Sequence, residues 1–533
     1  MVVSSNLMAS RVGLSILRRG GNAIDAAVAV GFALAVVDPR AGNIGGGGFM
    51  VIRFSDGRTT TFDFREKAPA AAHRDLYLDE LGEVIPDLST TGILASGVPG
   101  SVRGYGLAME KYGSLPWEVV VSPAVELAQD GFAVSYQLHR DMVYGEERFS
   151  QFEATWSIFY PQDRPLRLNA LFRQPELAAT LRRIATLGAD EFYTGRTARL
   201  IAEHMAARGG LITMEDLAAY RAVERPPVTF TYRDVEIISM GPPSSGGIVL
   251  AQILNQLEHQ DLSAMEFHSA EHIHLVAEAA RRAFADRAHH LGDADFVPVP
   301  VEELISKPYA RRRWQNVSPY WASLSEDVSA GDAGPSRESE ETTHFSVVDR
   351  RGNAVAVTTT INDLYGCGEV VAGAGFFLND EMDDFSAKPG HANMFDLTGG
   401  EANAIEPGKR MLSSMTPTIV TRNDTLLLIA GSPGGSKIIT TVAQIISNVV
   451  DFGLDLKEAV EAPRFHHQWH PDEIVSEPRA ISPETRRRLA RMGHQVRYRD
   501  GMMGSAHCIY VDRDSGWYFG VADSRRESGA VGY

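Results

Sequence analysis

The spacing of apolar residues near the N-terminus predicts two consecutive helices. Residues 7–19 carry apolar side chains at helical intervals and end in a basic turn followed by Gly20 and Gly21, as helix C-termini commonly do. Asn22 is suited to capping the next helix, because its side-chain oxygen can accept hydrogen bonds from free backbone N–H groups. That helix, residues 23–37, is apolar on nearly every side and should therefore be buried.

A hairpin should follow, and a run of four glycines at residues 45–48 precedes it. Residues 49–54 and 59–64 have strand sequence and flank the turn sequence of residues 55–58. Ordering four consecutive glycines costs considerable chain entropy. Two interpretations of the run stay open: it is a flexible loop, or its backbone must approach another group closely.

The middle of the chain, residues 95–310, is mainly of helical sequence. Helix starts are expected at Ser122-Pro123, with proline in the first turn, and at the capping residue Thr213. Residues 268–290 form a long amphipathic run, and residues 229–238 have strand sequence. No internal repeat is visible, so a repeat architecture is not expected.

A polar linker and a second hairpin are predicted next. Residues 315–341 are rich in Ser, Asp, Glu and Gly, which predicts an exposed, mobile linker. Residues 342–348 and 354–362 are strand sequence joined by a three-residue loop that ends in glycine. In that register Thr342 lies opposite Thr360.

Composition narrows the class of protein. The 533 residues are 44% hydrophobic and 22% charged, which is ordinary for a globular protein and excludes disordered and fibrous classes. A net charge of −17 argues against nucleic-acid and anionic-membrane partners. The most apolar stretch, residues 23–37, contains Asp25 and is too short to span a bilayer. No signal-peptide pattern is visible, so a cytoplasmic chain is expected, or a periplasmic or secreted one if the N-terminus is truncated.

Neither the cysteines nor the histidines predict a metal or cofactor site. Two cysteines, Cys367 and Cys508, allow at most one disulfide. They could form a structural zinc site only if histidines supplied the other ligands. The histidines that lie close in sequence have spacings or helix faces that fit no ligand set. They are His466, His467 and His470, and the pair His272 and His274. Residues 431–437 resemble a phosphate loop but lack the glycine required before the lysine.

The junction between Glu341 and Thr342 is the strongest candidate for chemistry. A threonine at the start of a strand is common, but this one follows an accessible linker and should face a second hydroxyl. If the chain were cut before Thr342, its hydroxyl and a new α-amine would share one residue. An α-amine has a pKa of about 7.7–8.0, so it can act as a base near neutral pH and activate the threonine as a nucleophile.

Residues 342–349 closely resemble the start of the small subunit in the γ-glutamyltranspeptidase (glutathione hydrolase) family. Similar motifs recur in the family's order along nearly the whole chain, at residues 20–27, 45–49, 64–69, 96–101, 242–247, 379–385, 412–415 and 431–436. The resemblance implies an α+β, four-layer αββα N-terminal-nucleophile hydrolase fold, with two stacked antiparallel sheets between helical layers. It also implies self-cleavage at Glu341-Thr342 into a large subunit, residues 1–341, and a small subunit, residues 342–533, which form one intertwined heterodimer.

The resemblance also implies residue roles. Thr342 would form a γ-glutamyl ester, Thr360 would orient it, and the N–H groups of Gly434 and Gly435 would hold the oxyanion. Six further residues would bind the substrate. Arg65, Ser413 and Ser414 would take its α-carboxylate, and Asn362, Glu381 and Asp384 its α-ammonium. No cofactor and no metal is implied.

The expected function is therefore γ-glutamyltransferase and glutathione hydrolase activity on glutathione and other γ-glutamyl compounds, with water, amino acids or peptides as acceptors. One alternative is a related amidohydrolase such as a cephalosporin acylase, for whose substrate Asp384 would have no clear partner. Another is a non-enzymatic homologue, against which the presence of Thr342 and Thr360 argues. Residues 389–400 are expected to form a lid, in which Phe395 replaces the tyrosine of many bacterial members and should give a looser gate.

Overall fold

Two antiparallel sheets form the centre of the computed structural model, which describes residues 1–330, 342–388 and 400–533. The seven-stranded sheet has the order β18-β1-β9-β10-β2-β3-β6. Its strands are β1 (Val2–Ser4), β2 (Gly47–Arg53), β3 (Thr59–Asp63), β6 (Val223–Arg225), β9 (Thr343–Val348), β10 (Ala354–Thr360) and β18 (Gly529–Val531). The six-stranded sheet has the order β17-β16-β12-β11-β8-β7. Its strands are β7 (Val228–Tyr232), β8 (Val235–Ser239), β11 (Thr418–Arg422), β12 (Thr425–Ala430), β16 (His507–Val511) and β17 (Tyr518–Ala522).

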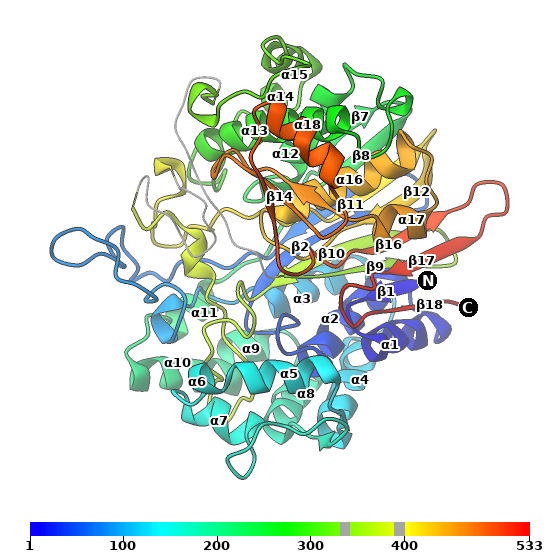
Figure 1. Ribbon diagram of the computed structural model, residues 1–533. Helices are drawn as coiled ribbons and strands as arrows, with labels where there is room; N and C mark the ends of the chain where they lie inside the picture. Colours follow the sequence, from blue (N-terminus) through cyan, green and yellow to red (C-terminus); the bar gives the residue numbers. More distant parts are fainter. Residues whose placement is uncertain (331–341, 389–399) are drawn as a thin grey trace.

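A helical layer covers the outer face of each sheet (Figure 1). Below the seven-stranded sheet lie α1 (Leu7–Arg18), α2 (Ala23–Val37), α3 (Ser101–Tyr112), α4 (Trp117–Asp130), α5 (Tyr136–Tyr144), α6 (Glu146–Phe149), α7 (Glu153–Phe159), α8 (Pro175–Leu187), α9 (Asp190–Thr194), α10 (Arg196–Arg208) and α11 (Met214–Ala219). Above the six-stranded sheet lie α12 (Gly246–Leu257), α13 (Ala270–His290), α14 (Val301–Leu304), α15 (Lys307–Trp314), α16 (Lys437–Val450), α17 (Leu456–Glu461) and α18 (Pro483–Arg491). The predicted stack of two antiparallel sheets between helical layers is confirmed.

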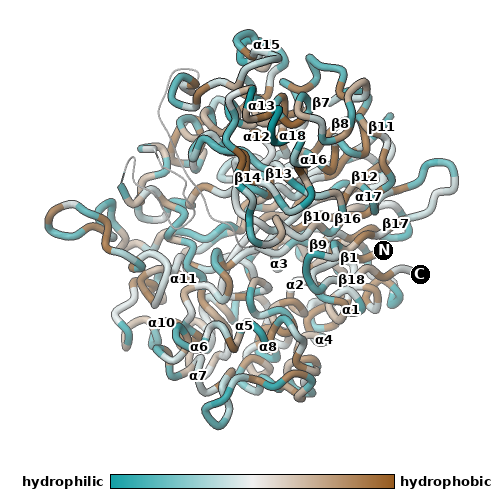
Figure 2. Tube along the Cα trace, viewed as in Figure 1, coloured by the Kyte–Doolittle hydropathy of each residue, from teal (hydrophilic) through white to brown (hydrophobic). Residues whose placement is uncertain are grey.

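Alternating side chains on the sheet build two cores. Phe345 and Val347 of β9 belong to the core shared with the lower helical layer, whereas Val348 belongs to the second core, which also includes residues of the six-stranded sheet and the upper helices. This is the period of two that a strand buried on both faces requires. In Figure 2, hydrophobic and hydrophilic stretches alternate along the flanking helices, as expected for helices with one face on a sheet. Within the described residues, no helix is both long and apolar enough to cross a membrane.

Local signals account for the elements around the N-terminus. Asn22 caps α2 by accepting hydrogen bonds from the backbone N–H groups of Ile24 and Asp25, and Asp25 accepts in return from the N–H of Asn22. Every residue of α2 is buried, as its composition predicted. The β9–β10 hairpin also has the predicted register, with Thr343 paired to Thr359.

Several predicted elements differ in the structure. Helix α4 begins at Trp117 and carries Pro123 in its interior, so the start expected at Ser122 was wrong. The Trp117 indole donates a hydrogen bond to Ile184 O at 2.8 Å, and this tertiary contact favours helix upstream of the proline. The strand expected at residues 229–238 is the β7–β8 hairpin, which turns where Arg233 has φ 51°.

The linker and the long helix are more buried than expected. Helix α13 is buried along nearly its whole length rather than amphipathic, and its charged side chains pair with one another. In the linker, Trp321 is 66% exposed as predicted, but Ser325 is buried and opens a short 3-10 helix, η3 (Ser325–Asp327). The predicted mobility of the linker stays a prediction.

The remaining strands form two small sheets away from the centre. One has the order β13-β14-β15 and consists of β13 (Phe465–His466), β14 (Ile474–Ser476) and β15 (Val496–Tyr498). The other pairs β4 (Phe132–Ala133) with β5 (Leu171–Phe172). The segment after β13, in the first of these sheets, reaches α13, where Arg281 contacts Asp472.

Candidate active site

The candidate nucleophile lies at the open end of the β9–β10 hairpin. Thr342 directly precedes β9 and is buried. Because Thr343 pairs with Thr359, one further step along the two strands brings Thr342 beside Thr360. The hydroxyl of Thr360 accepts a hydrogen bond from the backbone N–H of Asn362 at 2.8 Å, which holds it at the strand end. The facing threonines are therefore as the sequence predicted, while their catalytic roles stay predictions.

The four glycines are a site of close backbone approach, not a flexible loop. A Cβ atom on Gly46 would overlap the carbonyl oxygen of Thr360, and one on Gly48 would overlap that of Thr358. Strand β2 can therefore lie against β10, next to the candidate nucleophile, only because these positions lack side chains. Of the two interpretations that the sequence left open, the second is confirmed.

Arg65 forms a buried ion-pair cluster directly after β3. Its guanidinium donates from Nη1 to Glu381 Oε1 and from Nη2 to Asp384 Oδ2, both in the 3-10 helix η4 (Glu381–Asp384). It also donates to the backbone oxygens of Met411 at 3.3 Å and Leu412 at 3.1 Å. The structure thus brings together three predicted substrate-binding residues, Arg65, Glu381 and Asp384. The sequence did not indicate that they pair with one another.

Acidic groups outnumber the one guanidinium in this cluster. Glu66 lies 3.6 Å from Arg65, and neither of its buried carboxylate oxygens has a hydrogen-bond partner among the described residues. Burial raises the pKa of Glu66 to about 8, although the charge of Arg65 opposes the rise. Burial also raises the pKa of Glu381 well above its usual value, and the carboxylates of Glu66 and Asp384 add to the effect. Three carboxyl groups around one guanidinium leave the site attractive to a second cation.

Asparagine side chains hold the acidic helix η4 in place. Asn362 donates from Nδ2 to Asp380 O at 3.0 Å, and its buried Oδ1 has no partner among the described residues. Asn403 donates from Nδ2 to Asp384 O at 2.7 Å and accepts at Oδ1 from the N–H of Leu412 at 3.0 Å. The structure therefore brings Asn362 to the same cluster, whereas Asn403 and Glu66 were missed. Glu66 follows Arg65 within the motif of residues 64–69, which could have singled it out, but Asn403 carried no signal.

The two serines continue the segment that binds Arg65. Ser413 and Ser414 are buried and directly follow Leu412, whose oxygen accepts from Arg65. Ser413 is fixed through its backbone, since its N–H donates to Pro243 O at 3.0 Å and its oxygen accepts from the N–H of Ser245 at 2.6 Å. The conspicuous run at residues 242–247 thus positions the serine pair.

The candidate oxyanion glycines lie between β12 and α16. Gly434 has φ 132° and Gly435 has φ 56°, backbone conformations that favour glycine. The same loop starts at Gly431, where an added Cβ would overlap the ring of His344 on β9, so the loop packs against the strand that follows Thr342. Burial, with Arg499 and Arg497 nearby, lowers the pKa of Lys437 to about 7 at the first residue of α16.

Two predictions concern residues outside the described ranges. The predicted cleavage site includes Glu341, which lies outside the described ranges. The predicted lid with Phe395 falls on residues 389–399, which also lie outside them. Both cysteines are described, and each is buried and free. No disulfide joins them.

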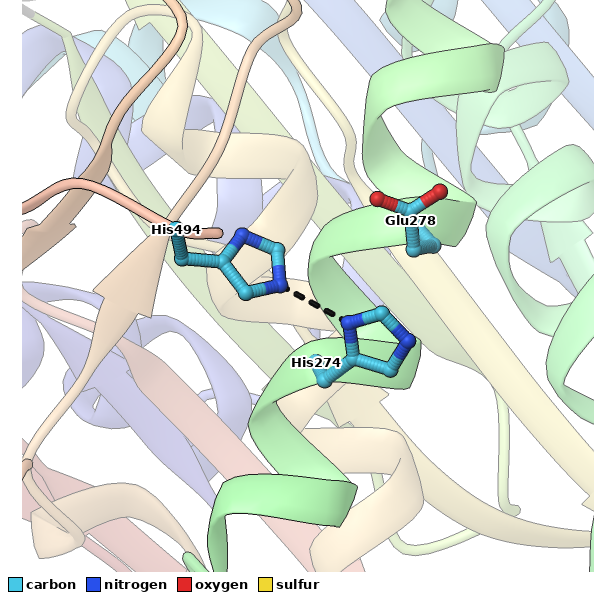
Figure 3. Close-up of side chains that lie close together, drawn as sticks. All are labelled: His274, Glu278 and His494. Atoms are coloured by element: carbon cyan, nitrogen blue, oxygen red, sulfur yellow. Dashed lines mark hydrogen bonds between the residues drawn. The ribbon is translucent and has the colours of Figure 1, made fainter. Parts of the chain in front are cut away.

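Among the described residues, one group of three could hold a metal ion: His274, Glu278 and His494 (Figure 3). Its carboxylate is already engaged, because Glu278 accepts from Arg281, Arg282 and Ser323. The two rings are hydrogen-bonded to each other, with His274 Nδ1 at 2.8 Å from His494 Nε2. Two arginines beside a paired carboxylate disfavour a cation, so the group is better described as a hydrogen-bond network.

The sequence and the fold of this chain are similar to those of known proteins. A family model described as gamma-glutamyltranspeptidase matches residues 9–533. The glutathione hydrolase proenzyme of Escherichia coli (strain K12) is 50% identical over 526 residues, which cover 98% of this chain and 90% of that protein. The acylase ACY 1 proenzyme of Pseudomonas sp. (strain V22) is 37% identical over 520 residues, covering 96% and 90%. The crystal structure of cephalosporin acylase from Bacillus halodurans superposes with a TM-score of 0.85 at 26% identity, covering 99% of this chain and 94% of that one.

Proposed function

This chain belongs to the γ-glutamyltranspeptidase family, and on that premise we propose that it is a γ-glutamyltransferase and glutathione hydrolase made as a self-cleaving proenzyme. It cleaves γ-glutamyl amides, glutathione among them, and passes the γ-glutamyl group to water, an amino acid or a peptide. The curated relative at 50% identity over nearly the whole chain is named as a glutathione hydrolase proenzyme, which supports both the activity and the precursor form.

The single observation that carries the substrate class is the cluster of Arg65 with Glu381 and Asp384. The α-carbon of a γ-glutamyl group bears a carboxylate and an ammonium side by side. A planar guanidinium suits the carboxylate, and the excess of buried carboxyl groups suits the ammonium. When the substrate enters, it takes over part of the internal pairing. Its carboxylate binds Arg65, and its ammonium binds Glu381, Asp384 and Asn362 Oδ1, which has no partner among the described residues.

Self-cleavage prepares the nucleophile. The hydroxyl oxygen of Thr342 attacks the carbonyl carbon of Glu341, the peptide C–N bond breaks, and an ester forms while the nitrogen takes the proton. Water then hydrolyses this ester. The products are a new C-terminal carboxylate on Glu341 and the regenerated Thr342 hydroxyl beside a free α-amine. That amine has a pKa near the working pH and accepts the hydroxyl proton in the next reaction.

Turnover repeats the same chemistry on the substrate. The Thr342 oxygen attacks the γ-carbonyl carbon, and the N–H groups of Gly434 and Gly435 hold the oxyanion, a contribution of about 3–4 kcal/mol for one such donor. The leaving amine departs with the proton from the α-amine, which leaves a γ-glutamyl ester on Thr342. Water or an acceptor amine then attacks the ester, and the proton that it loses returns through the α-amine to the threonine oxygen.

The sheet order supports a heterodimer of residues 1–341 and 342–533 after the cut. In the seven-stranded sheet, β1 of the first piece lies between β18 and β9 of the second. In the six-stranded sheet, β8 of the first piece pairs with β11 of the second. Separating two pieces whose strands interleave would break backbone hydrogen bonds in both sheets, so they should stay associated.

Mass spectrometry of the purified protein, followed by an assay with a γ-glutamyl anilide, tests the proposal. We expect two pieces that divide at Glu341-Thr342 and an active enzyme, whereas Thr342→Ala should give one uncut, inactive chain. An intact chain with full activity would contradict the mechanism.

A cephalosporin acylase is the second candidate, because the acylase relative and the acylase structure share the fold. A glutaryl anilide separates the two candidates, since it differs from the γ-glutamyl anilide only by the missing α-ammonium. We expect clear preference for the γ-glutamyl compound, because without its ammonium the buried carboxyl groups around Arg65 would gain no second cation. Equal rates would favour the acylase. A non-enzymatic homologue would process neither compound.

A further inference from the structure

A short segment of the linker, residues 318–325, is held by an extensive polar network, and we call this segment the strap. It contains no helix or strand before η3, and its large side chains Tyr320, Trp321 and Leu324 are exposed. Apolar burial therefore does not hold it in place. The strap lies between α15 and the proposed cleavage junction, and the residues that contact it come from both sides of that junction.

Ser325 at the end of the strap has all of its hydrogen-bonding groups engaged. Its N–H donates to Asp472 Oδ2 at 2.7 Å, and its oxygen accepts from the Trp469 indole at 2.8 Å. Its hydroxyl accepts from the Arg281 guanidinium, which also contacts Asp472. A serine fixed at three points, two of them from the proposed small subunit, has little freedom to move.

The rest of the strap is fixed in the same way. Glu278 of α13 accepts from the Ser323 N–H at 3.0 Å and from its hydroxyl at 2.6 Å. The N–H of Ala322 donates to Met492 O at 2.7 Å. His274 lies 2.7 Å from Ser318 O through Nε2, and because a carbonyl only accepts, this nitrogen carries the hydrogen.

The histidine pair in Figure 3 extends the network across the proposed subunit boundary. With the hydrogen of His274 on Nε2, its Nδ1 accepts from His494 Nε2 at 2.8 Å. His274 belongs to α13, and His494 follows α18, so the pair links the two proposed pieces beside the strap. Burial lowers the pKa of His494 to about 3, so the ring is neutral and can serve as a donor to a neutral partner.

Helix α13 contributes buried charged side chains to its contact with the strap. Glu278 is buried between Arg281 and Arg282, whose charges lower its pKa to about 2. Charges are costly to bury, and replacing a buried ion pair by apolar side chains is often neutral or stabilising in proteins. The Glu278 carboxylate accepts hydrogen bonds from both the N–H and the hydroxyl of Ser323, which an apolar side chain could not do.

We propose that the strap is a positioning device for self-cleavage, an inference that rests on the proposed function. Anchoring Ser325 helps to fix the chain that leads to Glu341, together with Arg313, which donates to Ser329 O at 3.1 Å, and with Ala330, which is buried. A shorter free segment has a smaller loop-closure entropy and a higher effective concentration of its end at the nucleophile. Trp469, Asp472 and Glu278 are thus positioning residues that act through the strap and not on the γ-glutamyl substrate.

The test uses full-length chains and separates the rate of self-cleavage from the activity of the cleaved enzyme. Trp469→Phe removes the indole N–H that binds Ser325 O, together with part of the ring that packs on the core, whereas Ser325→Ala removes only the hydroxyl. Tyr320→Ser is the matched control, because it changes an exposed side chain of the same strap. Precursor conversion is followed by pulse–chase on gels, and kcat and KM for a γ-glutamyl anilide are measured per cleaved molecule.

We expect each single variant to slow conversion by about fivefold, the effect of one net hydrogen bond, and the double variant by more than tenfold. Tyr320→Ser should convert at the parental rate, and kcat and KM of all cleaved enzymes should agree within about twofold. Glu278→Gln, which keeps the shape of the side chain, should also slow conversion.

Four outcomes would overturn the inference or its premise. Conversion of the double variant at the parental rate overturns the strap role. A parallel fall in conversion, kcat and melting temperature overturns it too, because the contacts would then only stabilise the fold. If the parent chain itself is never cut, or if Thr342→Ala is still cut, the proposed function fails and the strap inference fails with it.

Discussion

Arg65 and Asp384 form a buried ion pair between residues that are 319 positions apart in the chain, with the Arg65 Nη2 donating to Asp384 Oδ2. The side chains are only 1% and 3% exposed, so the pair is shielded from water. It joins the end of β3, which belongs to the proposed large subunit, to η4 of the proposed small subunit. The pair therefore links two segments that are distant in the chain, and we assign it to binding of the charged substrate.

Replacing Asp384 by asparagine should weaken substrate binding far more than self-cleavage. The variant keeps the size of the side chain but removes a negative charge that we assign to binding of the substrate ammonium. Losing one partner of a buried charge pair commonly costs about 2–5 kcal/mol, so KM for a γ-glutamyl anilide should rise at least thirtyfold. Gel analysis of the same preparation should show normal cleavage, because the substrate ammonium takes no part in that reaction. An equal loss of cleavage and binding would assign Asp384 to folding instead.

Glu66 should make the protein less stable as the pH rises from about 4.5 to about 8. Its pKa is raised from 4.5 to about 8 in the folded protein, so the folded state favours the protonated form. The resulting stabilisation is fully present below the unfolded-state pKa and is lost as the pH rises through the folded-state value. Glu66→Gln is neutral at every pH and should remove this part of the pH dependence. Melting temperatures between pH 5 and pH 9 measure it, with the exposed Glu80→Gln as control. Parallel curves for the parent and Glu66→Gln would show that Glu66 is ionised in the folded protein.

Local sequence signals predicted the elements that depend on neighbouring residues. The capping of α2 by Asn22 and the register of the β9–β10 hairpin follow from side chains and turn lengths within a few positions. The facing of Thr342 and Thr360 follows from that register. These features could be predicted because short-range hydrogen bonds and steric limits decide them.

Contacts between distant segments could not be predicted in the same way. Nothing near Arg65 in the chain indicates that its guanidinium pairs with Asp384 in the absence of substrate. The strap has the composition of a mobile linker, and its order comes from Glu278 and Asp472 on other elements. Helix α4 starts upstream of the expected cap because Trp117 packs against α8. In each case tertiary contacts outweigh the local signal.

Gly434→Ala should lower kcat without unfolding the protein. Gly434 has φ 132°, where a residue with a side chain is strained by about 1–3 kcal/mol. An added Cβ would meet its nearest neighbour, Gly504 Cα, at 3.4 Å, which is an ordinary contact. The backbone should therefore relax by rotating and move the N–H that we assign to the oxyanion hole. We expect kcat to fall at least tenfold with a small change in KM. Gly453→Ala is the matched control, because its φ is also positive, at 63°, but it lies after α16 with open space around it. If both variants lose only stability, the oxyanion role of Gly434 is wrong.

His272 should make the fold sensitive to acid. The ring packs among Phe267, Phe452 and Phe465 on the side of α13, and burial lowers its pKa from 6.5 to about 3. A histidine that is neutral when folded but protonated when unfolded contributes stability above pH 6.5 that is lost as the pH falls toward the folded-state pKa. The loss approaches about 1.4 kcal/mol per pH unit for one such group.

The variant His272→Leu isolates this contribution. It removes the titrating ring and the acceptor of the His268 N–H, so it should be somewhat less stable than the parent at pH 8. Between pH 6.5 and pH 5, however, its unfolding free energy should fall less steeply than that of the parent, because one protonation site is gone. Urea unfolding at a series of pH values measures both slopes, and His73→Leu, at an exposed position, should leave the parental slope unchanged. Equal slopes for His272→Leu and the parent would mean that the ring takes up a proton in the folded state, which its apolar surroundings oppose.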